Sequence, residues 1–123
     1  MNISLESHSD MLKIVSYDDS NIVIRDYDNT ESILRHNFIL SPNKIIKDRT
    51  ISIGNKDDIA YLTSLKPEVL ILTQVIPPKL YFDIKAQFET TSIGMESMSL
   101  GSACRTYNLL AAEGRDVVLV INF

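Results

Sequence analysis

Apolar and polar residues alternate at strand spacing through the first third of the chain. The runs 12–17 and 22–27 flank a cluster of Asp, Ser and Asn, which predicts a β-hairpin. A second extended pair is expected at 32–40 and 44–46. Residues 41–43 between them include a proline, which cannot donate to a strand ladder and so favours a turn. The first half of the chain is therefore expected to be a β meander.

The apolar spacing changes in the second half. Asp57 or Asp58 is expected to cap a helix that runs to about residue 64, with Pro67 just past its end. The unbroken apolar run 69–73 is typical of a strand covered on both faces. The elements expected after it are a helix from Pro77 with a buried stripe at Tyr81, Ile84 and Phe88, a strand at 91–96, a helix at 99–113 that Gly114 ends, and a strand at 116–122.

Alternation of strands and helices defines the expected fold class. Strands joined by helices of this length normally lie parallel, connected by right-handed crossovers. We expect an α/β protein: a single three-layer domain with a central mixed, largely parallel sheet covered by helices, and an N-terminal β meander that extends or caps it. Residues 1–10 are polar and Ser-rich and are expected to form a flexible tail before the domain at 11–123.

Composition narrows the class of protein. The 123 residues suit one domain, and 45% apolar with 23% charged residues excludes a disordered chain. The net charge of −4 argues against a nucleic-acid binder. No apolar run approaches the ~20 residues of a membrane span, and the first residues lack the pattern of a signal peptide. A soluble bacterial cytoplasmic protein without membrane insertion is expected.

The residues that normally carry chemistry are sparse. His8 and His36 are the two histidines and Cys104 is the single cysteine, so no metal site or disulfide is expected. The only Gly–Lys neighbourhood, at 53–57, lacks the second glycine of a phosphate-binding loop, and Gly94 stands alone. No cofactor is therefore expected.

A helical wheel of the 99–113 segment separates two faces at about 100° per residue. Cys104 and Tyr107 fall on the apolar stripe, which predicts a buried, inert thiol and a buried ring. Leu109 lies on the opposite, polar side with Arg105, either as a stray leucine or as the core of a protein contact. Asn108 is a poor helix former, so its side chain is expected to bond a neighbouring loop or line a cleft.

Charged residues near the same helix leave two interpretations open. Glu96 and Glu113 are the acidic candidates, and Arg105 and Arg115 are the basic ones. A Glu96–Arg105 or Glu113–Arg115 pair would build a functional pocket. The alternative is that all four are solvated caps or surface pairs, which contribute under ~1 kcal/mol each.

Two runs near the C-terminus carry a resemblance to a known family. Ala103-Cys104-Arg105-Thr106-Tyr107-Asn108 and Glu113-Gly114-Arg115 match the signature of the Mth-type conserved domain. This is a family of small α/β domains of unknown function that includes the mitochondrial complex I assembly factor 3. The resemblance extends more loosely over about residues 12–123. The sequence departs from the family pattern at 99–100, where relatives tend to have Asp-Thr, and at 73–75, where they usually carry Gly-Thr-Gly.

The resemblance implies an α/β fold without an established enzymatic activity. For the mitochondrial relative it implies a role in assembling respiratory complex I through protein partners. We therefore expect a non-catalytic protein-interaction or assembly factor, with respiratory-complex subunits or another assembly factor as partners. The candidate site residues are Glu96, Arg105, Asn108, Leu109, Glu113 and Arg115.

The rival hypothesis is a small-ligand-binding domain or an undetected enzyme. Open α/β sheets bind ligands at the carboxyl ends of their parallel strands. Those ends are expected near residues 73–74 and 96–97, and the cleft would be lined by Glu96, Arg105 and Asn108. A deep pocket there would favour a ligand, and a flat apolar patch at Leu109 would favour a protein partner.

Overall fold

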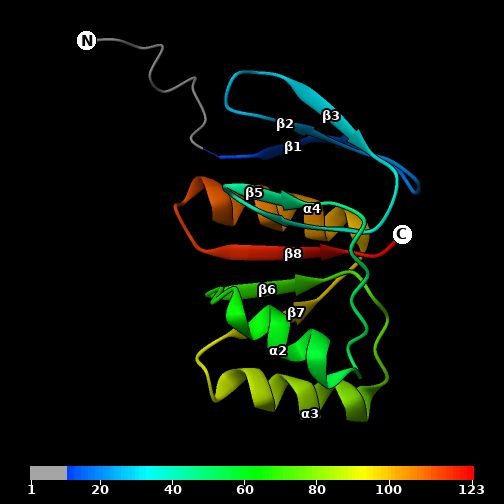
Figure 1. Cartoon of the computed structure of the whole chain (residues 1–123), viewed down its shortest axis with the longest axis vertical. Helices are drawn as coiled ribbons and strands as arrows, with labels where there is room; N and C mark the ends of the chain where they lie inside the picture. Colours follow the sequence, from blue (N-terminus) through cyan, green and yellow to red (C-terminus); the bar gives the residue numbers. More distant parts are fainter. Residues whose placement is uncertain (1–10) are drawn as a thin grey trace.

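The computed structural model describes residues 11–123, so the tail expected at 1–10 lies outside the described residues. Two β-sheets and three α-helices make up this part of the chain (Figure 1). In chain order the elements are β1 (Lys13–Tyr17), β2 (Ile22–Arg25), β3 (Glu31–Leu34), β4 (Phe38–Ser41), β5 (Lys44–Ile46), α2 (Lys56–Ser64), β6 (Val69–Leu72), α3 (Pro78–Glu89), β7 (Gly94–Ser97), α4 (Leu100–Ala112) and β8 (Val117–Ile121).

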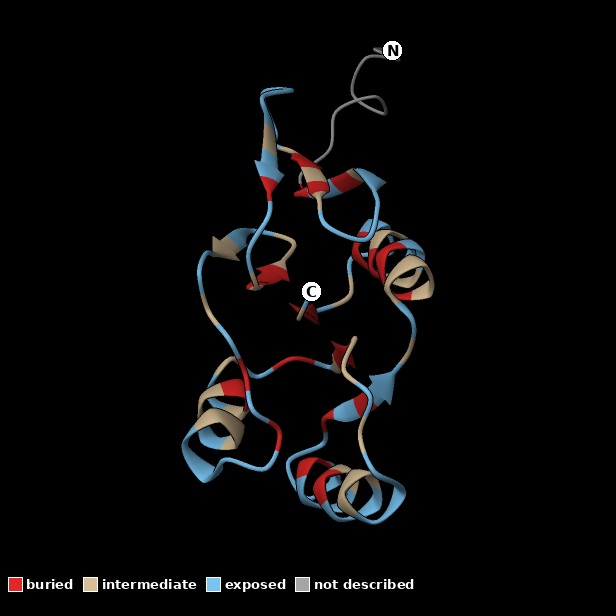
Figure 2. Ribbon diagram, turned by 90° about the vertical axis from the view of Figure 1, so that its right-hand side faces the viewer, coloured by how far each residue is buried: buried red, intermediate tan, exposed pale blue. Residues whose placement is uncertain are grey.

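The central sheet is mixed, as its sequence pattern predicts. Its strand order is β5-β4-β8-β6-β7, with β6 parallel to both β7 and β8, and β4 antiparallel to β5 and β8. Helices α2 and α3 cover one face, and α4 and the second sheet lie side by side against the other face (Figures 1 and 2). The expected α/β fold class is confirmed.

The N-terminal meander forms a separate sheet. Strands β1, β2 and β3 pair antiparallel in that order, and they do not join the central sheet. The apolar face of this small sheet, with Ile14, Ile22 and Ile24, packs in one cluster with α4 and the facing side of the central sheet. The meander therefore caps the domain and does not extend its sheet.

Alternating side chains of the central strands supply two separate cores. In β6 and β8, Ile71, Leu119 and Ile121 face α4 and the meander. Their neighbours on the same strands face α2 and α3; these are Leu70, Leu72, Val118 and Val120. All seven are buried, which explains why both strands read as unbroken apolar runs.

The extended run expected at 32–40 is wrong as one strand. It is broken at residues 35–37, so that β3 pairs with β2 and β4 pairs with β8. The Asn37 side chain fixes this corner, because its Oδ1 accepts from the Phe123 N–H at 2.8 Å and its Nδ2 donates to Thr50 Oγ1 at 3.0 Å. The hairpin turn expected at 41–43 is confirmed between β4 and β5.

The starts of helix α2 and strand β7 differ from those that the sequence predicts. Helix α2 is capped by Asn55, whose Oδ1 accepts from the Asp58 N–H at 3.0 Å; Asp58 itself accepts from the Ser52 N–H at 2.8 Å. Asp57 and Asp58 are therefore first-turn residues and not caps. Strand β7 begins at Gly94, three residues later than expected, because the Ile93 N–H bonds back to the Phe88 carbonyl at the end of α3.

Candidate functional site

Helix α4 docks between the central sheet and β1 through its apolar stripe. Ala103, Cys104 and Tyr107 are at most 1% exposed, and the small side chains of the first two allow close packing. The Tyr107 hydroxyl donates to the Leu12 carbonyl at 2.8 Å, which satisfies its polar group inside the core. The predicted burial of Cys104 and Tyr107 is confirmed.

Asn108 fastens the same helix to the edge of the meander. Its Oδ1 accepts from the Ile14 N–H at 3.0 Å, and its Nδ2 donates to the Ile14 carbonyl at 2.7 Å. The expectation that Asn108 bonds a neighbouring segment is confirmed, but that segment is strand β1 and not a loop. Asn108 therefore stabilises the fold by joining α4 to β1.

The two titratable groups on the buried stripe are held in their neutral forms. Burial raises the pKa of the Cys104 thiol to about 11, against a smaller opposing effect of the Arg105 charge. Burial also raises the pKa of Tyr107 well above its ordinary value. A nucleophilic cysteine needs a lowered pKa, so the environment of Cys104 is that of an unreactive core thiol.

The opposite side of α4 presents a surface that we name the α4 outer surface, made of Tyr17, Arg105 and Leu109. Arg105 Nη1 donates to the Tyr17 hydroxyl at 2.7 Å, and its Nη2 donates to Ser102 Oγ at 3.4 Å. Leu109 follows one helical turn after Arg105 and is 61% exposed, while Tyr17 is 40% exposed. The leucine that the wheel places on the polar side is therefore confirmed as exposed.

Gly101 makes room for the aromatic part of this surface. A Cβ at this position would lie 3.1 Å from the Tyr17 hydroxyl and 3.3 Å from its ring. The sequence interpretation missed Tyr17 and Gly101. A glycine inside a helical pattern was the available signal, because it is unfavourable unless close packing requires it.

The expected charge pairs are replaced by others. Glu96 Oε2 lies 3.5 Å from Lys85 Nζ of α3, and that amine also donates to the Met95 carbonyl at 2.9 Å. Arg115 Nε lies 3.2 Å from Glu68 Oε2. The hypotheses of a Glu96–Arg105 pair and a Glu113–Arg115 pair are therefore wrong. Glu96 pairs with Lys85, and Arg105 binds Tyr17. Arg115 pairs with Glu68, and Glu113 is the C-cap of α4.

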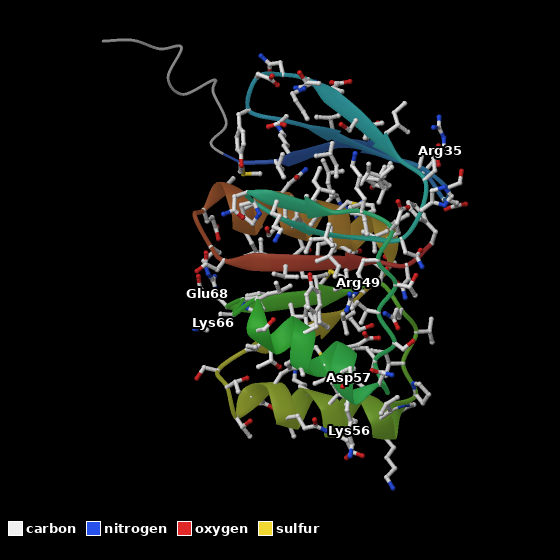
Figure 3. The ribbon with its side chains drawn as sticks, in the orientation of Figure 1. Arg35, Arg49, Lys56, Asp57, Lys66 and Glu68 are labelled. Atoms are coloured by element: carbon white, nitrogen blue, oxygen red, sulfur yellow. The ribbon has the colours of Figure 1, made fainter. Side chains whose placement is uncertain are left out.

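Glu68 ties together the strand starts at the amino end of the sheet. Its Oε1 accepts from the Asp116 N–H at 3.0 Å while its other oxygen binds Arg115. The hydrogen bond from the Asp116 N–H lowers the pKa of the Glu68 carboxyl below its usual range, and Arg115 lowers it further. Figure 3 shows Glu68 on the left side of the view, across from Arg35 at the upper right.

The six sequence candidates consequently lie in three places. Arg105, Asn108 and Leu109 belong to α4, with the first and last at its outer surface and Asn108 against β1. Glu113 is the C-cap of the same helix. Glu96 lies beside α3, and Arg115 lies with Glu68 just before β8. Glu96, Arg105 and Asn108 line none of the three cavities described below.

The carboxyl ends of β6 and β7 are tied together by polar side chains. Gln74 Nε2 donates to the Ile51 carbonyl at 2.9 Å, and Ser97 Oγ donates to the Gln74 carbonyl at 2.9 Å. Thr73 Oγ1 accepts from the Asn122 N–H at 3.1 Å. Side chains thus occupy the region where the sequence departs from the Gly-Thr-Gly of its relatives.

A cavity of about 400 Å³ lies at the other end of the sheet, between β5 and the end of α2. Its lining includes Ile39, Lys44, Ile46, Leu65, Pro67 and Asp116. Within residues 11–123, no three His, Cys, Asp or Glu side chains are grouped to hold a metal ion. No helix in that part of the chain is long and apolar enough to cross a membrane.

Layers and strand order define a small, mixed α/β domain of three layers. The chain belongs to the family described as proteins of unknown function (DUF498/DUF598), whose model matches residues 14–122. The family resemblance carried by the 103–108 and 113–115 motifs is thereby confirmed. No curated protein matches the chain significantly.

Several solved structures share the fold. The NMR structure of Xanthomonas campestris XCC1710 is 29% identical, covers 89% of this chain and 82% of its own, and superposes with a TM-score of 0.70. A Bordetella pertussis protein described as a Mth938-like domain is 18% identical over 93% of this chain and 87% of its own, with a TM-score of 0.63. A Bartonella henselae structure, described as an outer membrane protein, is 24% identical over 94% and 97%, with a TM-score of 0.62.

Proposed function

We propose that this domain is a non-catalytic protein-binding module that acts as an assembly factor, and that its partner binds the α4 outer surface. The observation that carries the proposal is the exposure of Leu109, at 61%, one turn from the Arg105–Tyr17 hydrogen bond. Arginine and tyrosine are enriched at the energetically dominant positions of protein interfaces, and Leu109 adds an exposed apolar side chain beside them.

Pre-organisation of the surface supports the proposal. The 2.7 Å hydrogen bond to Arg105 and the contact with Gly101 hold the Tyr17 side chain before any partner arrives. A side chain that is already ordered loses less conformational entropy on binding. The guanidinium of Arg105 also keeps donors for a carboxylate or carbonyl of the partner.

The separation of the candidate residues supports a non-catalytic role. General acid–base or nucleophilic catalysis requires several groups within hydrogen-bond reach of one substrate. Glu96 and Arg115 are each engaged with another residue, and Asn108 is used on the backbone of Ile14. Cys104 is buried as a neutral thiol.

The proposed partners follow from the sequence resemblance. A family that includes a complex I assembly factor points to subunits of a respiratory complex, or to a second assembly factor. In a bacterium we place this encounter in the cytoplasm.

Capture of partners from the native cell tests the proposal. A tagged chain is crosslinked at its natural level of expression, and the captured proteins are quantified by mass spectrometry. Leu109→Glu is compared with Val75→Glu, a matched control that puts the same charge at a 99% exposed apolar position after β6. Both variants are expected to fold. We expect Leu109→Glu alone to lose the partner; equal recovery from both variants would remove the α4 outer surface from the function.

A further inference from the structure

A second surface lies at the carboxyl end of β8, where two loops meet. One loop, residues 35–37, joins β3 to β4; the other, residues 47–50, follows β5. Two adjoining cavities of about 180 and 470 Å³ share Arg35, His36 and Asp48 in their linings. Figure 2 looks onto this end of the molecule, and Figure 3 labels Arg35 there.

Positive charge is left uncompensated in this cleft. Three of the five arginines bind carboxylates, and Arg105 binds Tyr17 and Ser102. Arg35 is the exception, because its side chain makes no hydrogen bond or ion pair with any residue of 11–123. Within the same residues, Lys47 and His36 are also without a side-chain partner. Among the side chains that line the cleft, Asp48 is the single carboxylate near these groups, in a chain of net charge −4.

The two loops that carry the cations are cross-tied. The Asn37 carbonyl accepts from the Arg49 N–H at 3.0 Å, and its side chain bonds Thr50 Oγ1 and the Phe123 N–H. Each of these contacts joins the 35–37 loop to the 47–50 loop or to the end of β8. The backbones that position Arg35 and Lys47 are therefore fixed relative to each other before a ligand binds.

We propose that this cleft binds a small organic oxyanion, through a phosphoryl or carboxylate group. The Arg35 guanidinium provides a planar fork of donors for two oxygens, and Lys47 adds a second positive charge. Phe123 and Ile33, 42% and 52% exposed, supply apolar walls for the body of the molecule. A cavity of about 470 Å³ falls within the usual range of small-molecule sites. The site shares no residue with the α4 outer surface, so it stands independently of the proposed partner.

An NMR titration of the ¹⁵N-labelled protein tests this site. Inorganic phosphate and succinate are added separately, with sodium chloride adjusted to keep the ionic strength constant, because weak charge screening must not mimic binding. We expect saturable shifts confined to the amides of 35–38 and 47–50 and to the side-chain amide of Asn37. The anion with the lower dissociation constant identifies the group as phosphoryl or carboxylate.

Matched variants make the test decisive. Arg35→Gln is expected to weaken binding at least tenfold, while Lys79→Gln, at an exposed lysine of α3, leaves it unchanged. Thermal unfolding should be the same for both, because Arg35 has no side-chain hydrogen bond or ion pair to lose within residues 11–123. Non-saturating shifts with both anions, or equal binding by Arg35→Gln, would overturn the proposal. Saturable binding of only a DNA oligonucleotide or anionic vesicles would overturn the small-molecule class.

Discussion

The Asn108 side chain makes the two hydrogen bonds to the Ile14 backbone that a neighbouring strand would otherwise make. Strand β1 is an edge of the three-stranded sheet, and at Ile14 it exposes one N–H and one C=O away from β2. Asn108 bonds both groups, at 3.0 and 2.7 Å. Because an open strand edge invites pairing with other chains, this contact both closes the edge and fixes helix α4 to the meander.

Removal of the Asn108 amide should therefore destabilise the domain. Asn108→Ala leaves two partly buried backbone groups of Ile14 without a partner, which is expected to lower the free energy of unfolding by about 1–3 kcal/mol. Leu109→Ala, at the exposed neighbouring position, is the control and should change it by less than about 0.5 kcal/mol. Urea denaturation of both variants measures the difference, and equal midpoints would contradict the assignment.

Two substitutions of Tyr107 separate the contribution of its buried ring to stability from that of its hydroxyl. Tyr107→Phe keeps the buried ring but leaves the Leu12 carbonyl unbonded, so a loss of about 1–2 kcal/mol is expected. Tyr107→Ala also empties the site of the ring and should cost roughly 3 kcal/mol or more. A calorimetric series of the three proteins checks the order; a fully stable Tyr107→Phe would show that the hydrogen bond contributes little.

Periodicity predicted the parts of the fold that burial dictates. The apolar runs of β6 and β8 and the wheel of α4 identified buried faces correctly, including Cys104 and Tyr107. Gly114 was correctly placed at the end of α4, where its φ of +79° suits glycine. These features depend on local sequence, since each segment carries its own pattern.

Apolar periodicity could not predict which side chains far apart in the sequence form ion pairs or hydrogen bonds with each other. Arg115 lies two residues from Glu113 but binds Glu68, 47 positions away, because the crossover to β8 brings the two strand starts together. The break at 35–37 was equally hidden, since neither glycine nor proline marks it. Only the tertiary contacts of Asn37 reveal the corner.

Cys104 should couple stability to pH in the alkaline range. Burial raises the thiol's pKa to about 11 in the folded state, from an unfolded value near 9.0. Between these values the unfolded chain loses the proton more readily, so folding stability falls as the pH rises above 9. Cys104→Ala has no thiol and therefore lacks this contribution to the pH dependence of folding stability. The stability advantage of the wild type over Cys104→Ala, measured in urea at pH 8, should narrow by pH 10.5, and a constant difference would contradict the raised pKa.

Gly54 and Gly114 are both exposed with open space around them, so substituting each by alanine isolates the effect of backbone conformation. A Cβ would meet nothing within 4 Å at either Gly54 or Gly114, but only Gly114 has a positive φ, of +79°. Gly114→Ala is therefore expected to cost about 1–2 kcal/mol through backbone strain alone. Gly54→Ala should be neutral or slightly stabilising. Thermal melts of the two variants give the comparison, and similar melting temperatures would argue against a left-handed cap at the end of α4.

Gly101 connects the packing of α4 to its outer surface. A Cβ there would lie 3.1 Å from the Tyr17 hydroxyl and 3.2 Å from Arg105 Nη1, and both atoms are at the ends of flexible exposed side chains. Gly101→Ala should therefore leave the free energy of unfolding within about 1 kcal/mol of the wild type, because the gain in helix propensity offsets the displacement. The Tyr17 ring should move away from Arg105, which NMR resonances of the ring report. Ser102→Ala removes the 3.4 Å contact of Arg105 and the 3.2 Å hydrogen bond with Ser99 Oγ, and it should leave the ring in place. If the α4 outer surface binds the partner, Gly101→Ala should also reduce partner capture while Ser102→Ala retains it; an unmoved Tyr17 ring in Gly101→Ala would contradict the packing.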